Sequence, residues 1–89
     1  MITGWLVRFL LTPVNQNATI SFSGPQNIES ANLLVYNTNG ETVFADQENG
    51  NTAFNFQRAG LPSGIYLYEI KTIDNNGEAN FISGKIYLL

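Results

Sequence analysis

Apolar and polar residues alternate along most of the chain with a period of two, in short runs bounded by Gly, Asn and Pro. This pattern is typical of β-strands with one buried face, and no segment has the period of about 3.6 residues that marks an amphipathic helix. The expected strands span residues 5–11, 18–23, 32–37, 42–46, 53–57, 65–74 and 79–82, and residues 85–89 close the chain after a bulge or bend at Gly84.

The alternation also predicts which side chains face the core. Ile20 and Phe22 share one face of their strand, and Phe54 and Phe56 share one face of theirs. In residues 32–37 both faces are apolar. A run of this kind predicts a strand in the middle of a sheet, covered on both sides.

Turn signals separate the strands. Asn39-Gly40 predicts a two-residue type I′ hairpin, since both residues tolerate positive φ. The run from Leu61 to Tyr66 has the spacing of a tyrosine corner, in which a Tyr hydroxyl bonds back to the backbone. Turns about every 8 to 12 residues predict an all-β, seven-stranded antiparallel immunoglobulin-like β-sandwich, formed as a single domain by residues 1–89. A small barrel is the alternative.

Composition removes whole classes of function. The chain has 89 residues, no His, no Cys, four Lys and Arg together, and a formal net charge of -3. Without these residue types there is no imidazole base, no thiolate nucleophile, no disulfide and no ordinary zinc site. A surface poor in Lys and Arg argues against nucleic-acid binding. The apolar runs are far shorter than the roughly 20 residues of a membrane-spanning helix, so no membrane insertion is expected.

Several local patterns resemble functional signals or sites, but each is better explained as part of the fold. Residues 1–11 resemble a hydrophobic signal core, but Arg8 interrupts them and no cleavage site follows, so a strand is predicted. The acidic stretches 46–49 and 74–78 contain oxygen ligands for a cation. Placing Gly77 at the sixth position of a calcium loop puts Thr72 and Ser83 where carboxylates are required, so a hairpin turn is favoured.

Aromatic residues could instead form a sugar-binding platform, because sugars stack on exposed rings. The candidates are Trp5, Tyr36, Tyr66, Tyr68 and Tyr87. A core this small needs most such residues for packing, so burial is the favoured interpretation. The glycosylation sequon at Asn17-Ala18-Thr19 is assigned no function.

Three runs together resemble the C-terminal sorting domain (type A) of Bacteroidetes proteins exported by the type IX secretion system. The first is Leu61-Pro-Ser-Gly-Ile-Tyr-Leu-Tyr-Glu-Ile70, the second Leu33-Leu-Val-Tyr-Asn-Thr-Asn-Gly-Glu-Thr-Val43, and the third Ser83-Gly-Lys-Ile-Tyr-Leu-Leu89. Their order and spacing cover roughly residues 13–89. The family typically opens with Tyr-Pro-Asn-Pro, whereas this chain has Leu10-Leu-Thr-Pro13 and keeps only the second Pro.

The resemblance implies a non-catalytic domain without a cofactor. It would fold in the periplasm behind an N-terminal cargo domain, be recognised by the outer-membrane secretion machinery, and reach the cell surface or the medium. The implied recognition segment is Lys85, Ile86, Tyr87, Leu88 and Leu89, and the implied structural residues are Gly40, Leu61, Gly64 and Tyr66. Exposed edge strands accept a further strand, so self-association is a second use of such an edge.

Two other functional classes remain open from the sequence. A carbohydrate-binding or adhesion module of a bacterial surface protein would carry an aromatic row on one exposed sheet face. An inert spacer domain would show neither binding nor sorting.

Overall fold

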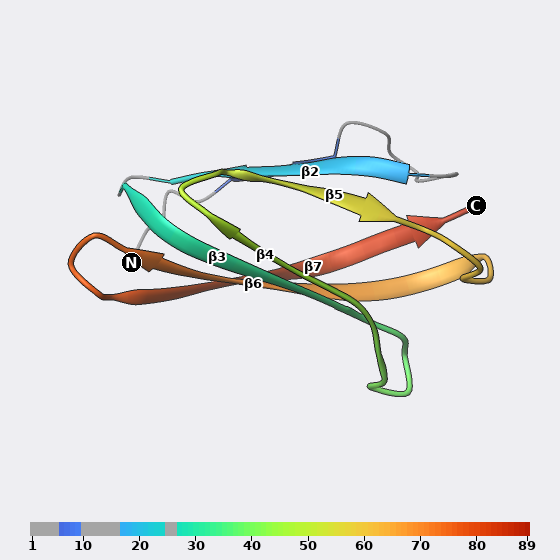
Figure 1. Ribbon diagram of the computed structural model, residues 1–89. Helices are drawn as coiled ribbons and strands as arrows, with labels where there is room; N and C mark the ends of the chain where they lie inside the picture. The colour runs from blue at the N-terminus through green and yellow to red at the C-terminus, as the bar shows by residue number, and fades with distance from the viewer. Residues whose placement is uncertain (1–5, 10–16, 25–26) are drawn as a thin grey trace.

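The computed structural model describes residues 6–9, 17–24 and 27–89, which form antiparallel strands joined by short turns. One sheet has the order β1-β2-β5 and contains β1 (Leu6–Phe9), β2 (Asn17–Ser23) and β5 (Ala53–Gln57). The other has the order β4-β3-β6-β7 and contains β3 (Ile28–Tyr36), β4 (Thr42–Asn49), β6 (Gly64–Asp74) and β7 (Ala79–Leu88). Figure 1 shows the two sheets as separate layers, with β2 and β5 above the longer strands. The expected all-β architecture of two antiparallel sheets is confirmed, and the barrel alternative is wrong.

The strands differ from the expected ones in number and extent. β2 to β7 are described over their whole length, but β1 is described only as four residues of the expected segment 5–11. Six of the seven expected strands are therefore confirmed. β3 begins at Ile28 rather than at residue 32, because the alternation continues through the polar residues that precede Ala31. β7 runs unbroken through Gly84, so the expected bulge or bend there is wrong.

The core lies between the two layers and follows the expected faces. Phe54 and Phe56 of β5 are 1% and 0% exposed, and Ile20 and Phe22 of β2 are also buried. The ring of Phe22 stacks on that of Phe54 with centroids 5.6 Å apart. Aromatic pairs of this kind stabilise a small core beyond the area that they bury.

β3 is a central strand of its sheet, as predicted from the apolar residues on both of its faces. It pairs with β4 on one side and with β6 on the other. Leu33 and Val35 are buried in the core, while Leu34 points to the outer face of the sheet and is partly exposed. Phe44 of β4 packs edge-on against Phe56 at 5.0 Å, which joins this edge of the second sheet to β5 of the first.

The hairpin between β3 and β4 is not the expected type I′ turn. Only Gly40 has positive φ (87°), whereas type I′ requires positive φ at Asn39 as well. Gly40 N–H donates to the Asn37 carbonyl and Asn37 N–H donates to the Glu41 carbonyl, both at 3.0 Å. This is a three-residue loop that ends in a glycine bulge. The Asn37 side chain stabilises it, because its Oδ1 accepts the N–H groups of Asn39 and Glu41 at 3.0 Å.

Candidate functional site

The predicted recognition segment lies on β7 and divides between two faces of the sheet. Ile86 and Leu88 are 2% and 3% exposed and belong to the core. Lys85 and Tyr87 (48%) are exposed on the outer face, and Leu89 (63%), which follows the end of β7, is also exposed. The five residues therefore do not form one continuous surface, because a strand directs successive side chains to opposite faces. Ile86 and Leu88 anchor the strand, and the other three face solvent.

The backbone of β7 is also open on one side, since this strand ends the sheet order β4-β3-β6-β7 of the described residues. Asp74 N–H donates to the Glu78 carbonyl at 2.9 Å, so this pair is hydrogen bonded. Bonded and non-bonded pairs alternate along an antiparallel ladder, and the register from Ile73↔Ala79 to Gly64↔Leu88 has no shift. The backbone groups of alternate β7 residues therefore point away from β6, and these residues are Ala79, Phe81, Ser83, Lys85 and Tyr87.

Apolar side chains flank Lys85 on the outer face. Tyr87 lies opposite Ile65 of β6, which is 46% exposed, and Lys85 lies opposite Leu67. Phe81, 62% exposed, lies opposite Lys71, whose ammonium nitrogen is 5.9 Å from the ring centroid. Sequence reasoning missed Ile65 and Phe81, although their positions in the alternation place them on the outer face. The free edge of β7 is thus bordered by exposed apolar groups and one lysine.

Three of the four predicted structural residues, Leu61, Gly64 and Tyr66, lie at the corner that leads into β6. The Tyr66 hydroxyl donates to the Pro62 carbonyl at 2.7 Å, and the Tyr66 side chain is buried. Gly64 begins β6 with φ of 149°, and Leu61 packs against the core while partly exposed. Because Gly64 pairs with Leu88, this corner borders the end of β7. Gly40 lies in the hairpin between β3 and β4, away from the corner in the sequence.

Two contacts that sequence reasoning missed involve β7 and the residue that follows it. Gly84 lies against the ring of Tyr68, where a Cβ would stand 2.6 Å from Cε2. Arg58, in the corner before β6, donates to the carbonyl oxygen of Leu89. Neither contact has a local sequence signal, since Tyr68 and Gly84 meet only through strand pairing and Arg58 and Leu89 lie 31 positions apart.

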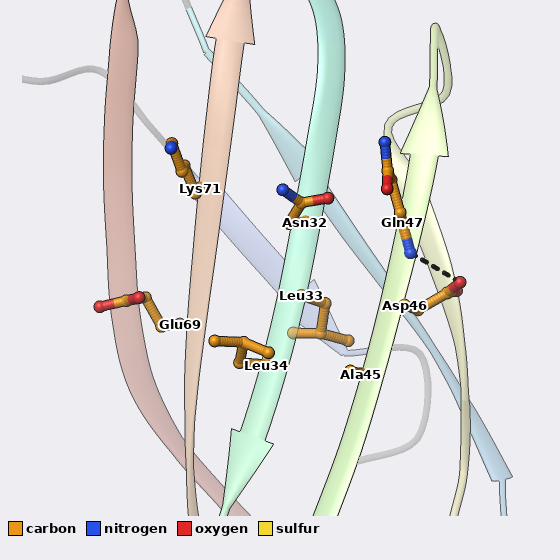
Figure 2. Close-up of a pocket in the computed structure, with 8 residues that line it drawn as sticks. All are labelled: Asn32, Leu33, Leu34, Ala45, Asp46, Gln47, Glu69 and Lys71. Atoms are coloured by element: carbon orange, nitrogen blue, oxygen red, sulfur yellow. Dashed lines mark hydrogen bonds between the residues drawn. The ribbon is translucent and has the colours of Figure 1, made fainter. Parts of the chain in front are cut away.

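The outer face of the four-stranded sheet also carries an open hollow, shown in Figure 2. Leu34 and Ala45 line it together with Asn32, Gln47, Glu69 and Lys71. No aromatic ring is among its lining residues, so it lacks the stacking surface of a sugar site.

The candidate sugar-binding aromatics do not form an exposed row in the described part of the chain. Tyr66 and Tyr68 are 5% and 7% exposed, as the packing interpretation predicted. Tyr36 is partly buried on the outer face, and Tyr87 is exposed at the edge. Trp5 lies outside the described residues.

The two acidic stretches use their carboxylates in local hydrogen bonds, residues 74–78 in a hairpin turn and residues 46–49 within strand β4 rather than in a loop. Asp74 Oδ1 accepts the N–H groups of Asn76 and Glu78 at 2.9 Å, and Asp46 Oδ1 accepts Gln47 N–H at 2.8 Å. Among residues 6–9, 17–24 and 27–89, no group of three or more acidic, His or Cys side chains could hold a metal ion. The same residues include no helix long and apolar enough to cross a membrane.

Comparisons with known proteins are consistent with this geometry. A family model described as the secretion system C-terminal sorting domain matches residues 12–83. No curated protein matches the chain. The crystal structure of CopC from Methylosinus trichosporium OB3b is similar in fold, with a TM-score of 0.63, 8% sequence identity and 93% of each chain covered. At that identity the likeness concerns the β-sandwich fold alone.

Proposed function

Because the chain belongs to the family of C-terminal sorting domains of the type IX secretion system, we propose that it is a non-catalytic sorting signal recognised at the free edge of β7. Membership implies export to the cell surface or the extracellular space, interaction with the secretion machinery and attachment to a larger cargo protein. The family is one of sorting signals and not of enzymes. The proposed recognising partner is the outer-membrane translocon.

The observation that carries the proposal is the open edge of β7. Ser83, Lys85 and Tyr87 combine exposed side chains with backbone groups that point away from β6. Such an edge accepts a further strand, whose main-chain hydrogen bonds give affinity while neighbouring side chains give specificity. Ile86 and Leu88 contribute by fixing β7 to the core.

We also propose that the sandwich is immunoglobulin-like and that residues 1–89 form one domain. The sheet orders support this topology, because the chain changes sheets between β2 and β3, between β4 and β5, and again before β6. The bond from Tyr66 to Pro62 supports it as well, since a tyrosine corner is common in such folds.

A reporter fusion tests the sorting function. Residues 1–89 are placed behind a signal peptide and a fluorescent protein in a Bacteroidetes host, with and without a working type IX translocon. We expect the reporter on the cell surface or in the medium only when the translocon works. Retention of a folded fusion in the periplasm of the competent host would refute the proposal.

The two lysines of the chain provide a matched pair for locating the recognised edge. Lys85→Ala should reduce export, because Lys85 lies on the edge strand itself. Lys71→Ala should not, because Lys71 is also exposed but lies one strand inward on β6. Equal export of the two variants would argue against recognition at β7. Deleting residues 86–89 is a poorer test, since it removes two core side chains.

A further inference from the structure

Arg58 joins the corner before β6 to the end of β7. Its Nε donates to the Leu61 carbonyl at 3.0 Å and its Nη2 donates to the Ser63 hydroxyl at 3.1 Å. Its Nη1 donates to the carbonyl oxygen of Leu89. Figure 1 shows that the chain between β5 and β6 and the end of β7 lie at the same end of the molecule. One guanidinium therefore contacts both the corner and the recognition segment.

The backbone of Arg58 extends the connection to the other sheet. Its N–H donates to Asn17 Oδ1, at the start of β2, at 3.2 Å. Arg58 thus lies between β2 of one sheet and the end of β7 in the other. The planar guanidinium is preorganised, so less conformational entropy is lost for each hydrogen bond that it forms.

Within the described residues, the chain is held less firmly after Leu88, which is the last core residue of β7. Leu88 pairs with Gly64 at the last position of the β6–β7 register, so Leu89 has no cross-strand partner among these residues. The Leu89 side chain is 63% exposed and buries little apolar surface. Ends of edge strands with few buried contacts open locally at low free energy. The contact from Arg58 therefore acts where β7 is least stable.

We propose that Arg58 is a positioning residue that keeps the end of β7 on the sheet, so that Lys85 and Tyr87 are presented at the free edge. This inference rests on the proposed sorting function. The planar guanidinium satisfies Leu61, Ser63 and Leu89 together. The ammonium of a lysine lacks this forked geometry, so Arg58→Lys does not replace it.

Hydrogen exchange of the 1–89 chain tests the contact directly. In Arg58→Ala and Arg58→Lys, the amides of Ile86 and Leu88 should exchange about tenfold faster, as expected for the loss of one charged hydrogen bond. The amides of Leu33 and Val35, in the core strand β3, should keep their protection. Ser63→Ala is the matched control, because it removes one acceptor but leaves the contact with Leu89. Unchanged exchange at Ile86 and Leu88 in Arg58→Ala overturns the inference.

Export of the reporter fusion tests whether this positioning matters for sorting. Arg58→Ala should lower translocon-dependent export several-fold at a temperature where the domain remains folded. Faster exchange with normal export would overturn the positioning role. If export of the unsubstituted fusion did not depend on the translocon, the proposed sorting function would be refuted. If hydrogen exchange were unchanged in Arg58→Ala, only the proposed role of Arg58 would be refuted.

Discussion

Gly84 occupies the middle of β7 because the ring of Tyr68 fills the space that a side chain would need. A Cβ at Gly84 would lie 2.6 Å from Cε2, 2.7 Å from the hydroxyl oxygen and 2.8 Å from Cζ of that ring. Tyr68 is only 7% exposed, so the surrounding core restricts its ring. The glycine therefore permits close packing within a strand whose register is unbroken.

Gly84→Ala should lower the free energy of unfolding by about 1–3 kcal/mol, as overpacking of a core typically does. Gly60→Ala is the control, since no atom lies within 4 Å of the added Cβ. It should change stability by less than about 0.5 kcal/mol. Urea unfolding of both variants measures the difference, and similar losses would contradict this explanation of Gly84.

Tyr66 holds the corner before β6 through its hydroxyl. Tyr66→Phe removes the bond to the Pro62 carbonyl and should cost about 0.5–1.5 kcal/mol of stability. Tyr87→Phe removes a hydroxyl from a half-exposed ring on β7 and should be nearly neutral. Thermal unfolding of the two variants tests this, and an equal decrease in Tm would show that the corner bond contributes nothing specific.

Burial makes the stability of the domain sensitive to alkaline pH through Tyr68. Desolvation raises the pKa of the Tyr68 hydroxyl above its usual value of 10.0, because burial disfavours the phenolate. The native state therefore holds this proton more tightly than the unfolded chain, and stability falls as the pH rises above about 10. Tyr68→Phe should show a smaller decrease between neutral and alkaline pH in urea unfolding. An identical decrease would exclude Tyr68 as the cause.

The hairpin between β3 and β4 and the hairpin between β6 and β7 have the same pattern of hydrogen bonds from backbone N–H groups to a side chain. Asn37-Thr-Asn-Gly-Glu41 and Asp74-Asn-Asn-Gly-Glu78 place an oxygen acceptor first and a glycine fourth. In both, the first side chain accepts two backbone N–H groups and the glycine has positive φ. The Asn-Gly dipeptide alone suggests a type I′ turn, but the acceptor two positions before that Asn favours the longer loop with a bulge. This explains why the turn type was mispredicted.

Substitutions at Asp74 test what stabilises the hairpin between β6 and β7, and Asn37 in the other hairpin provides the comparison. Asp74→Asn should keep stability within about 0.5 kcal/mol, because Asn37 performs the same role in the other hairpin. Asp74→Ala should cost about 0.5–1.5 kcal/mol, since it removes two hydrogen bonds from a part-buried turn. Chemical denaturation distinguishes the two variants. Equal losses would mean that the side-chain acceptor is not what stabilises the turn.

Across the whole molecule, the sequence predicts features that follow from the alternation of apolar and polar residues. It does not predict contacts between residues that are far apart in the chain. The core positions of Phe54 and Phe56 and the central place of β3 follow from period-two patterns, which the sheet structure preserves. The packing of Gly84 against Tyr68 and the hydrogen bond from Arg58 to Leu89 join residues that are far apart in the sequence. The expected recognition segment was a run of five residues, whereas pleating turns Ile86 and Leu88 into the core.

Among the residues that the structure describes, the sandwich leaves β7 as an open edge with little protection. Natural edge strands are commonly blunted by charges, proline or bulges. β7 carries Lys85 as its one charged residue, and it has neither proline nor a shift in register. An edge of this kind suits a strand that is meant to be paired by a partner.

Export of Ser83→Pro is the measurement that tests recognition by strand pairing most directly. Proline removes a backbone N–H that points away from β6, so the ladder that holds β7 in the sheet is retained. With circular dichroism showing an intact fold, we expect translocon-dependent export to be lost, while Ser83→Ala, which keeps the N–H, is exported normally. Normal export of a folded Ser83→Pro fusion would contradict recognition through the open edge of β7.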